Sequence, residues 1–286
     1  MEKSDSSVLG ALTRRQNSET RMSERLDDLG TGDDPDVTVV VPASNARPGI
    51  ARTLDFLIAS VAPHASLEIL VVVNDEIPGP VVSDVRLYRV NTDPRVELHQ
   101  LPGRDKAAAI RYGFERARGR VWGYSDGDLG WQARVDETSD MLSLLLSGSC
   151  DLVAAQRDQS QWTPVRRWKT NVFRWIGRWV FRHHMVDSQA PLKFMTAEVG
   201  RAVLGSCAFQ GWEFDVELLW WVRRFGYRIR PYPVHWSTTG TETTLETVVL
   251  GLVFMGPAMV VNLARVRVRA WFLQRRLTRR YRRIPA

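Results

Sequence analysis

Short apolar runs alternate with stretches of helical spacing from Val37 onward, and this alternation limits the chain to an α/β fold. The strand-like runs are residues 37–41, 68–73, 96–101, 120–124 and 151–155, and the helix-like stretches are residues 50–61, 105–118 and 135–146. Strands that alternate with helices predict a largely parallel sheet covered by helices. Such sheets bind ligands beyond the carboxyl ends of their strands, so the residues that follow the strands are the candidates for a functional site.

Polar side chains follow several of these strands, and the most informative of them are Asp126, Gly127 and Asp128. In an extended strand end the two carboxylates point the same way, and together they supply hard oxygen ligands for one divalent cation. The other interpretation is a solvated acidic turn, because Asp-Gly is a common turn dipeptide. Asn74 and Arg157 end two other strands, and this shared edge favours a single site.

The basic charge of the chain is local. The net charge is +7, but residues 265–283 carry nine arginines and no acidic residue, and the remainder is slightly acidic. This pattern describes a basic tail, and a face for binding nucleic acid is not expected, because the arginines directly follow a long apolar run. Cys150 and Cys207 have no metal-ligand spacing and suggest no disulfide framework, which fits a reducing cytoplasm. Residues 1–35 are polar without an apolar core of a signal peptide, and we expect them to be disordered.

Several motifs resemble those of one enzyme family, and they occur in the order in which that family carries them. The sequence is similar to inverting family 2 glycosyltransferases of the GT-A fold, and most similar to the branch that makes dolichyl- or polyprenyl-phosphate glucose and mannose. The resemblance covers about 200 residues. The matching segments are Val39-Val40-Val41-Pro42-Ala43-Ser44-Asn45, residues 68–75, Lys106-Ala107-Ala108-Ala109-Ile110-Arg111, Asp126-Gly127-Asp128-Leu129, Asp187-Ser188-Gln189-Ala190-Pro191-Leu192-Lys193-Phe194, Trp212-Glu213-Phe214-Asp215-Val216-Glu217, and residues 226–236.

The resemblance implies a GT-A, Rossmann-like nucleotide-diphospho-sugar transferase fold over residues 36–243. It implies a nucleotide-sugar donor and a divalent metal ion, Mg²⁺ or Mn²⁺, on Asp126 and Asp128, where the metal would act as a Lewis acid on the leaving diphosphate. The donor-binding residues that it implies are Pro42, Ser44, Asn74, Lys106 and Asp126.

The resemblance also implies a lipid-phosphate acceptor. Such a phosphate is already ionised and needs cations more than a strong general base. Arg157 is expected to act in catalysis together with Asp128 and Asp187, although Asp187 has a second interpretation, as a residue that fixes the loop before residue 192. The acceptor phosphate would be bound by Arg166, Arg167, Lys193 and Asp215. For Arg166 and Arg167 a solvated helix start is an equally good interpretation. For Asp215 the alternative is a structural role, because an acidic side chain in the first turn of a helix interacts favourably with the helix dipole.

The chain departs from the family pattern at four positions. Ser44 and Ala46 replace the Tyr and Glu that follow the first strand of the family, and Asn74 replaces its first Asp after the second strand. Gly130 stands where the mannose branch has a Gln metal ligand. These departures leave the nucleotide base open between UDP, GDP and another nucleotide.

Residues 247–264 form an uncharged apolar stretch that reaches only the lower limit for a bilayer span. Nine arginines follow this stretch. If the stretch spanned a membrane and the catalytic domain were cytoplasmic, the arginines would lie on the far side, which the positive-inside rule opposes. We therefore expect residues 244–286 to form an apolar or amphipathic helix with an arginine-rich tail that lies on the anionic cytoplasmic face of a membrane. The alternative is a long helix packed on the domain.

The sequence thus predicts a metal-dependent, inverting transferase that moves a sugar from a nucleotide sugar to a polyprenyl phosphate. Two alternatives stay open: a family 2 glycosyltransferase with a soluble or saccharide acceptor, and a catalytically silent, membrane-associated binding domain.

Overall fold

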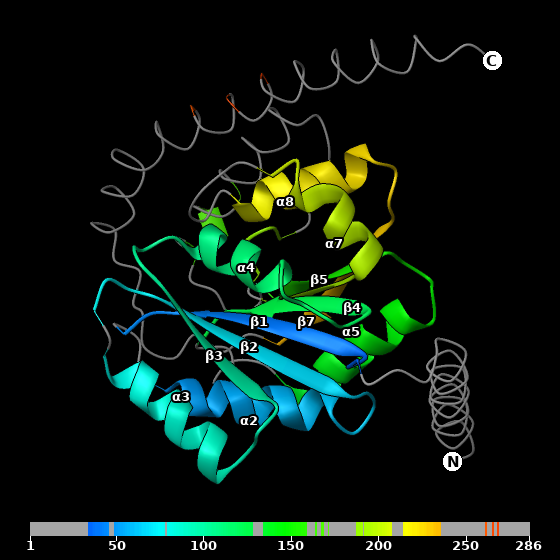
Figure 1. Cartoon of the computed structure of the whole chain (residues 1–286). Helices are drawn as coiled ribbons and strands as arrows, with labels where there is room; N and C mark the ends of the chain where they lie inside the picture. The colour runs from blue at the N-terminus through cyan, green and yellow to red at the C-terminus, as the bar shows by residue number, and fades with distance from the viewer. Residues whose placement is uncertain are drawn as a thin grey trace, which may run out of the picture.

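The computed structural model describes residues 34–45, 49–77, 79–127, 134–158, 187–190, 192–207 and 214–235, together with the single residues 164, 167, 168, 171, 261, 265 and 268. Strands and helices alternate along most of this part, as the apolar pattern predicts (Figure 1). The elements are β1 (Val37–Ala43), α2 (Ile50–Val61), β2 (Leu67–Asn74), α3 (Pro80–Asn91), β3 (Val96–Leu101), α4 (Lys106–Phe114), β4 (Val121–Ser125), α5 (Val135–Leu146), β5 (Leu152–Arg157), β6 (Leu192–Thr196), α7 (Ala197–Leu204), α8 (Phe214–Arg224) and β7 (Ile229–Val234).

The strands form one seven-stranded sheet in the order β3-β2-β1-β4-β6-β5-β7. All neighbouring pairs are parallel except those of β6, which runs antiparallel to β4 and β5. The carboxyl ends of β1, β2, β4 and β5 therefore share one edge of the sheet, and β6 begins at that same edge, because Ser125 pairs with Leu192. The mixed but mostly parallel sheet confirms the predicted fold class.

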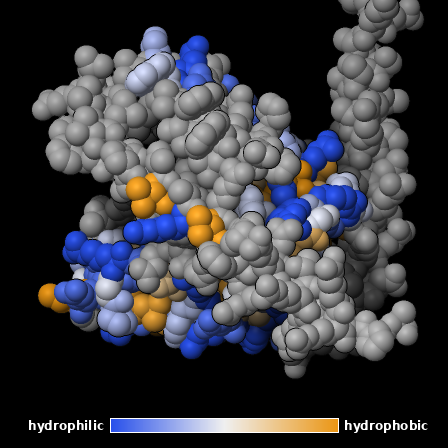
Figure 2. Space-filling view, turned by 90° about the horizontal axis from the view of Figure 1, so that it is seen from above, coloured by the Kyte–Doolittle hydropathy of each residue, from blue (hydrophilic) through white to orange (hydrophobic). Residues whose placement is uncertain are grey.

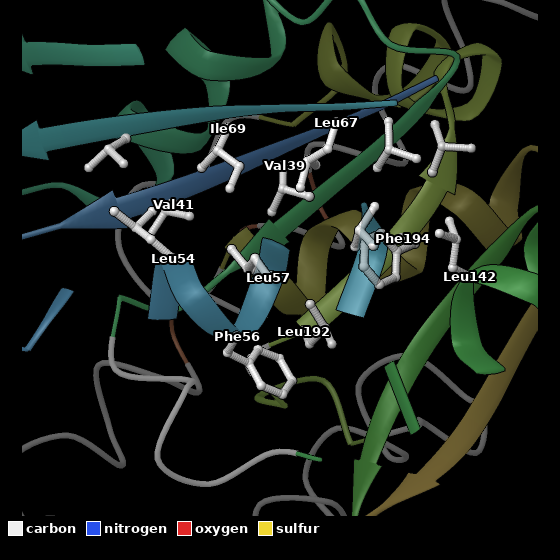
Figure 3. Packing of buried hydrophobic residues seen from close by; sticks show 14 of the residues in the cluster. Val39, Val41, Leu54, Phe56, Leu57, Leu67, Ile69, Leu142, Leu192 and Phe194 are labelled. Carbon is white, nitrogen blue, oxygen red and sulfur yellow. The ribbon is translucent and has the colours of Figure 1, made fainter. Parts of the chain in front are cut away.

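Helices cover both faces of the sheet. On one face, α2, α3 and α5 bury a cluster that includes Val39 and Val41 of β1, and Figure 3 shows Leu54 and Leu57 of α2 packed beside these side chains. On the other face, α4, α7 and α8 cover Val40 and Trp122. Because successive strand residues point to opposite faces, a strand covered on both sides reads as an unbroken apolar run, which is the pattern of β1 and β2.

Among the described strands, β7 forms one edge of the sheet and pairs with β5 alone. The carbonyl groups of Arg228 and Val234 accept hydrogen bonds from the β5 side. With a period of two along the strand, the backbone groups of Pro231 and Pro233 face away from β5. Proline has no N–H group, so at these two positions the outer side of β7 has no donor.

Exposed apolar side chains of the described residues include Ile77 after β2, and Leu87 and Val90 on α3. On the face shown in Figure 2, apolar side chains lie in small groups separated by hydrophilic ones, which is normal for a protein surface. In the part of the chain that the structure describes, no helix has both the length and the apolar character needed to cross a bilayer. The predicted helix of residues 247–264 and the arginine-rich segment lie outside the described residues, apart from 261, 265 and 268.

Candidate active site

The carboxyl ends of β1 and β4 meet closely at Gly127. The hydroxyl of Thr53 on α2 donates a 2.7 Å hydrogen bond to the carbonyl oxygen of Gly127. A Cβ atom on Gly127 would lie 3.4 Å from the carbonyl oxygen of Pro42, at the end of β1. The predicted donor residues Pro42 and Asp126 therefore lie at one edge, on neighbouring strands.

The end of β2 carries an unused hydrogen-bond acceptor. The amide nitrogen of Asn74 donates to the carbonyl oxygen of Asp105 at 2.7 Å, which fixes the orientation of the amide group. The amide oxygen of Asn74 is buried and has no hydrogen-bond partner among the described residues. Gly103, with a φ of 95°, lies beside this oxygen, and its own backbone conformation favours glycine. A buried acceptor without a partner is costly, so this oxygen is well suited to receive an N–H group from a ligand.

The loops after β1 and β2 hold each other in place. The backbone N–H of Asn45 donates to a carboxylate oxygen of Asp75 at 2.5 Å, and the side-chain amide of Asn45 donates to the carbonyl oxygen of Ile77 at 2.9 Å. The guanidinium of Arg104 lies 3.2 Å from the other oxygen of Asp75. These bonds fix the backbone of the two loops, which form the wall of the site around Ser44 and Asn74.

Next to this wall, a chain of alternating charges runs from the interior to the sheet edge. Lys193 donates to Asp215 Oδ1 at 2.8 Å and to the carbonyl oxygen of Ala190 at 2.7 Å. Tyr124 donates to the same Oδ1 atom of Asp215. Lys106 lies 3.4 Å from Asp215 Oδ2 and 2.7 Å from Asp126 Oδ1. The set of Lys106, Tyr124, Asp126, Lys193 and Asp215 is called the charge chain below.

The charges of this chain support one another. Burial opposes a charge on Asp215, yet the ammonium groups of Lys106 and Lys193 outweigh burial and lower the pKa of this carboxyl group. Burial also opposes a charge on Lys106, but Asp215 and Asp126 together raise its pKa. For Lys193 burial is the stronger influence, and its pKa is lowered. At neutral pH, Asp215 is therefore a carboxylate and Lys106 an ammonium group.

The burial of the charge chain changes the roles expected for two residues. The side chain of Lys193 has no exposed surface, and Asp215 is 1% exposed. The predicted direct contact of Lys193 and Asp215 with an acceptor phosphate does not fit this arrangement, because both side chains lie beneath the surface and bind each other. In contrast, the side chains of Lys106 and Asp126 are 29% and 31% exposed and face the site.

Arg157 and Asp187, both predicted to act in catalysis, form a bidentate ion pair. The guanidinium donates from Nε to Oδ2 at 2.7 Å and from Nη2 to Oδ1 at 2.8 Å. The side chain of Asp187 is 4% exposed and that of Arg157 is 15% exposed. The pair joins the end of β5 to the segment that precedes β6, so Asp187 at least fixes this loop, which was its second predicted interpretation.

The structure describes only part of the predicted metal site. Asp128 and Arg166 lie outside the described residues, and Arg167 is exposed in a helical segment. No group of three or more His, Cys, Asp or Glu side chains among the described residues is arranged to hold a metal ion. Such a group is not required where a metal is shared with substrate phosphates, because Mg²⁺ then uses one or two carboxylates. The partly exposed carboxylate of Asp126 fits that kind of site.

The sequence did not predict two residues that complete the edge. Tyr124 bonds to Asp215, and Asp105 accepts from the backbone of Ala107 as the N-cap of α4 and from Asn74. The N-cap had a sequence signal, because Asp is favoured before the first turn of a helix. The partner of Tyr124 had none, because it comes from α8, 91 residues away.

Comparisons with known proteins agree with this geometry. The family model described as glycosyl transferase family 2 matches residues 38–203. The chain belongs to this family. It is also 26% identical over 247 residues to the glycosyltransferase AglD of Haloferax volcanii, an alignment that covers 81% of this chain and 38% of that relative. The chain thus spans less than half the length of the curated relative that it matches. The predicted family and enzyme class are confirmed.

Solved structures of another sugar-transferring enzyme show a similar fold. Glucosyl-3-phosphoglycerate synthase from Mycobacterium tuberculosis, in complex with Mn²⁺, UDP and glucosyl-3-phosphoglycerate, is 15% identical with a TM-score of 0.56, and the match covers 82% of this chain and 80% of that chain. The complex of that synthase with Mn²⁺, UDP-glucose and phosphoglyceric acid has a TM-score of 0.55 at 14% identity, covering 82% of this chain and 79% of that one. At this identity the likeness establishes the fold.

Proposed function

We propose that this family 2 glycosyltransferase moves a sugar, with inversion, from a nucleoside-diphosphate sugar to a polyprenyl phosphate, at the cytoplasmic face of a membrane. The observation that carries the donor half is the edge formed by Asn74, Lys106 and Asp126. At one edge of the sheet it offers a buried acceptor without a partner among the described residues at the end of β2, an ammonium group at the start of α4 and a carboxylate directly after β4.

The unpartnered oxygen of Asn74 suits a base that presents a ring N–H. Uracil and guanine have such a donor next to a carbonyl group, whereas cytosine and adenine have an accepting ring nitrogen and donate from an exocyclic amino group instead. Because the amide nitrogen of Asn74 is already bound to Asp105, the amide cannot turn over to serve an accepting base without losing that bond. Among the bases that present a ring N–H we favour uracil over guanine, because the solved structure of similar fold holds UDP.

The leaving diphosphate needs positive charge. A divalent ion held by Asp126 and Asp128 would supply Lewis acidity there, and the relatives solved with Mn²⁺ support that assignment. Lys106 provides a second cation at the same edge. The acceptor phosphate oxygen forms the new bond to C1 of the sugar, and the bond from C1 to the diphosphate oxygen breaks with its electron pair. No proton must move, because a phosphate monoester is already ionised at neutral pH.

The lipid acceptor is supported by the sequence beyond the described domain. An uncharged stretch at residues 247–264 precedes nine arginines at residues 265–283, and such a segment binds anionic membrane surfaces. A second candidate acceptor is a soluble phosphorylated acid, because the solved relatives include complexes with phosphoglyceric acid and glucosyl-3-phosphoglycerate.

The experiment incubates the purified full chain with labelled UDP-, GDP-, CDP- and ADP-glucose or mannose. Acceptors are polyprenyl phosphate in anionic vesicles or 3-phosphoglycerate in solution, with Mn²⁺ or with excess chelator. We expect transfer to the lipid from a UDP or GDP sugar, and loss of transfer with chelator. The variants Asp126→Asn and Asp128→Asn should lose most activity, and the control Asp84→Asn, on the exposed side of α3, should keep it.

Each result decides between the candidates. Transfer to 3-phosphoglycerate alone would establish the soluble acceptor and contradict the lipid acceptor. Full transfer in excess chelator would contradict the metal. A chain that uses no nucleotide sugar with either acceptor would contradict the proposed donor and favour a catalytically silent binding domain.

A further inference from the structure

The interior part of the charge chain lies outside the contacts that a substrate can make. Asp215 and Lys193 are buried completely or nearly so, and only Lys106 and Asp126 reach the site edge. A buried ion pair is weak evidence for stability, because removing charges from water costs more than many pairs recover. The arrangement therefore calls for another explanation than stability of the domain.

The bonding pattern orients the Asp215 carboxylate. Its Oδ1 atom accepts from both Tyr124 and Lys193. Lys193 is in turn held by the carbonyl oxygen of Ala190 at 2.7 Å. With Oδ1 occupied in this way, Oδ2 faces Lys106 at 3.4 Å. The carboxylate comes from α8, the tyrosine from β4 and the lysine from β6, so three elements fix the direction of one oxygen atom.

Lys106 lies between two carboxylates as a result. It contacts Asp126 at 2.7 Å and Asp215 at 3.4 Å. If Asp126 were the only anion nearby, the flexible lysine side chain would follow that carboxylate wherever it moved. The second anion below keeps the ammonium group at the base of the site, where it can meet a diphosphate while Asp126 is used for other contacts.

We propose that Asp215 is a positioning residue for the donor diphosphate, and that it acts through Lys106, with Lys193 and Tyr124 as the groups that hold Asp215. This inference rests on the proposed donor, a nucleoside diphosphate sugar. It places Asp215 on the donor side of the reaction, whereas the family resemblance implied a place on the acceptor side.

The test uses variants that keep the buried charge balanced. Asp215→Asn alone would leave the buried Lys193 without its carboxylate partner, and could unfold the chain. The double variant Asp215→Asn with Lys193→Met removes one negative and one positive charge and retains a side chain of similar length. A second variant, Lys106→Met, removes the group through which Asp215 is proposed to act. The triple variant combines all three changes.

The control changes a buried carboxylate at the opposite edge of the sheet. Glu68, near the start of β2, is 4% exposed and bonds to Thr38 at 2.6 Å and to Arg118 at 2.7 Å. Glu68→Gln disturbs a comparable buried polar network that has no contact with Lys106. It should lower the melting temperature and leave nucleotide affinity unchanged.

The first readout is calorimetric titration of the full chain with UDP and with GDP in the presence of Mn²⁺ and without acceptor, after circular dichroism has confirmed folding. We expect the double variant and Lys106→Met each to weaken binding by about tenfold, the effect of one well-placed charged contact. The triple variant should bind no more weakly than Lys106→Met, because groups that act through one another are not additive.

The second readout is steady-state kinetics of the double variant, in which the KM for the donor should rise and the KM for the acceptor should stay constant. Additive losses in the triple variant, or a folded double variant with unchanged nucleotide affinity, would overturn the positioning role. A changed acceptor KM with unchanged donor binding would return Asp215 to the acceptor side. Absence of nucleotide binding to the wild type would contradict the proposed function itself, and the inference with it.

Discussion

The ion pair between Arg157 and Asp187 allows a direct test of whether Asp187 acts on substrate or only holds the chain. The perturbation is Asp187→Asn, which keeps the size of the side chain and one acceptor oxygen but removes the charge. In the structure, both carboxylate oxygens of Asp187 accept from the guanidinium, at 2.7 and 2.8 Å, and the side chain is 4% exposed. The substitution therefore leaves the Arg157 cation with an imperfect partner in a poorly solvated place.

The magnitude follows from that burial. Removing one partner of a buried ion pair costs about 3–5 kcal/mol. Because Arg157 retains 15% exposure and asparagine keeps one acceptor, we expect the lower end, about 3 kcal/mol. For a domain of roughly 200 residues, each kcal/mol shifts the melting temperature by about 2–4 °C, so the expected decrease is about 6–12 °C.

The assay is thermal unfolding followed by circular dichroism, with sugar transfer measured on the same preparation well below the melting temperature. The control is Asp151→Asn, which breaks a bidentate pair with Arg228 that is much more exposed. Surface pairs contribute little, so the control should shift the melting temperature far less. If Asp187→Asn abolishes transfer and leaves the melting temperature unchanged, Asp187 acts on the substrate and the structural argument is refuted.

Three further predictions concern packing, pH and the tail. Gly127→Ala should fold and stay active, because the new Cβ would meet only ordinary van der Waals contacts, the shortest at 3.4 Å. Gly123→Ala would place a Cβ 2.6 Å from the Phe194 ring. Its free energy of unfolding, measured in urea, should therefore fall by about 1–3 kcal/mol. Hydrogen bonding from Arg228 lowers the pKa of Asp151 in the folded chain. Above about pH 4, the pKa of aspartate in the unfolded chain, Arg228→Gln should therefore show its full loss of stability relative to the wild type. This difference should disappear as the pH falls through the lower folded pKa, and an equal difference at every pH would contradict the pairing. Vesicle binding at low salt should fall when Arg275, Arg276, Arg279 and Arg280 are changed to Gln, because each arginine contributes about 1 kcal/mol near an anionic surface. Transfer to a soluble short-chain acceptor should continue. Unchanged vesicle binding would contradict the electrostatic contribution, and protease access to the tail from the far side of sealed vesicles would contradict a peripheral helix.

Local patterns in the sequence predicted most of the fold. Helices α2 and α5 begin and end where the apolar spacing places them, at Ile50–Val61 and Val135–Leu146, and β3 lies at Val96–Leu101. Helix α4 is shorter than the predicted 105–118, because its last turn tightens and the N–H of Arg116 bonds to the carbonyl of Gly113 instead of continuing the helix.

Helix α3 was not predicted, although its sequence carries a signal. Proline opens the helix, and the buried residues Val81, Val85 and Tyr88 recur at helical spacing. The polar positions between them, and the exposed Leu87 and Val90, weaken the apolar stripe. The stripe becomes clear only when the sheet surface that it covers is known.

The candidate site was predicted in position more than in detail. Strand ends alone indicated that Asn74, Asp126 and Arg157 share an edge, because that follows from parallel topology. The burial of Lys193 and Asp215 did not follow, since it depends on α8 packing over β4 and β6, which are distant in the sequence. A lysine between Leu192 and Phe194 is compatible with a ligand contact or with an internal ion pair, and only the tertiary arrangement distinguishes them.

The two prolines of β7 determine how this sheet can meet other chains. A sheet edge with free N–H groups is a template for an added strand, and unprotected edges promote self-association. At Pro231 and Pro233 the outer side of β7 offers carbonyl groups without donors, so an incoming strand would find no N–H group at two consecutive outward positions. Within the described sheet, a polypeptide that adds a strand by regular hydrogen bonding is therefore favoured at β3, at the opposite end from β7.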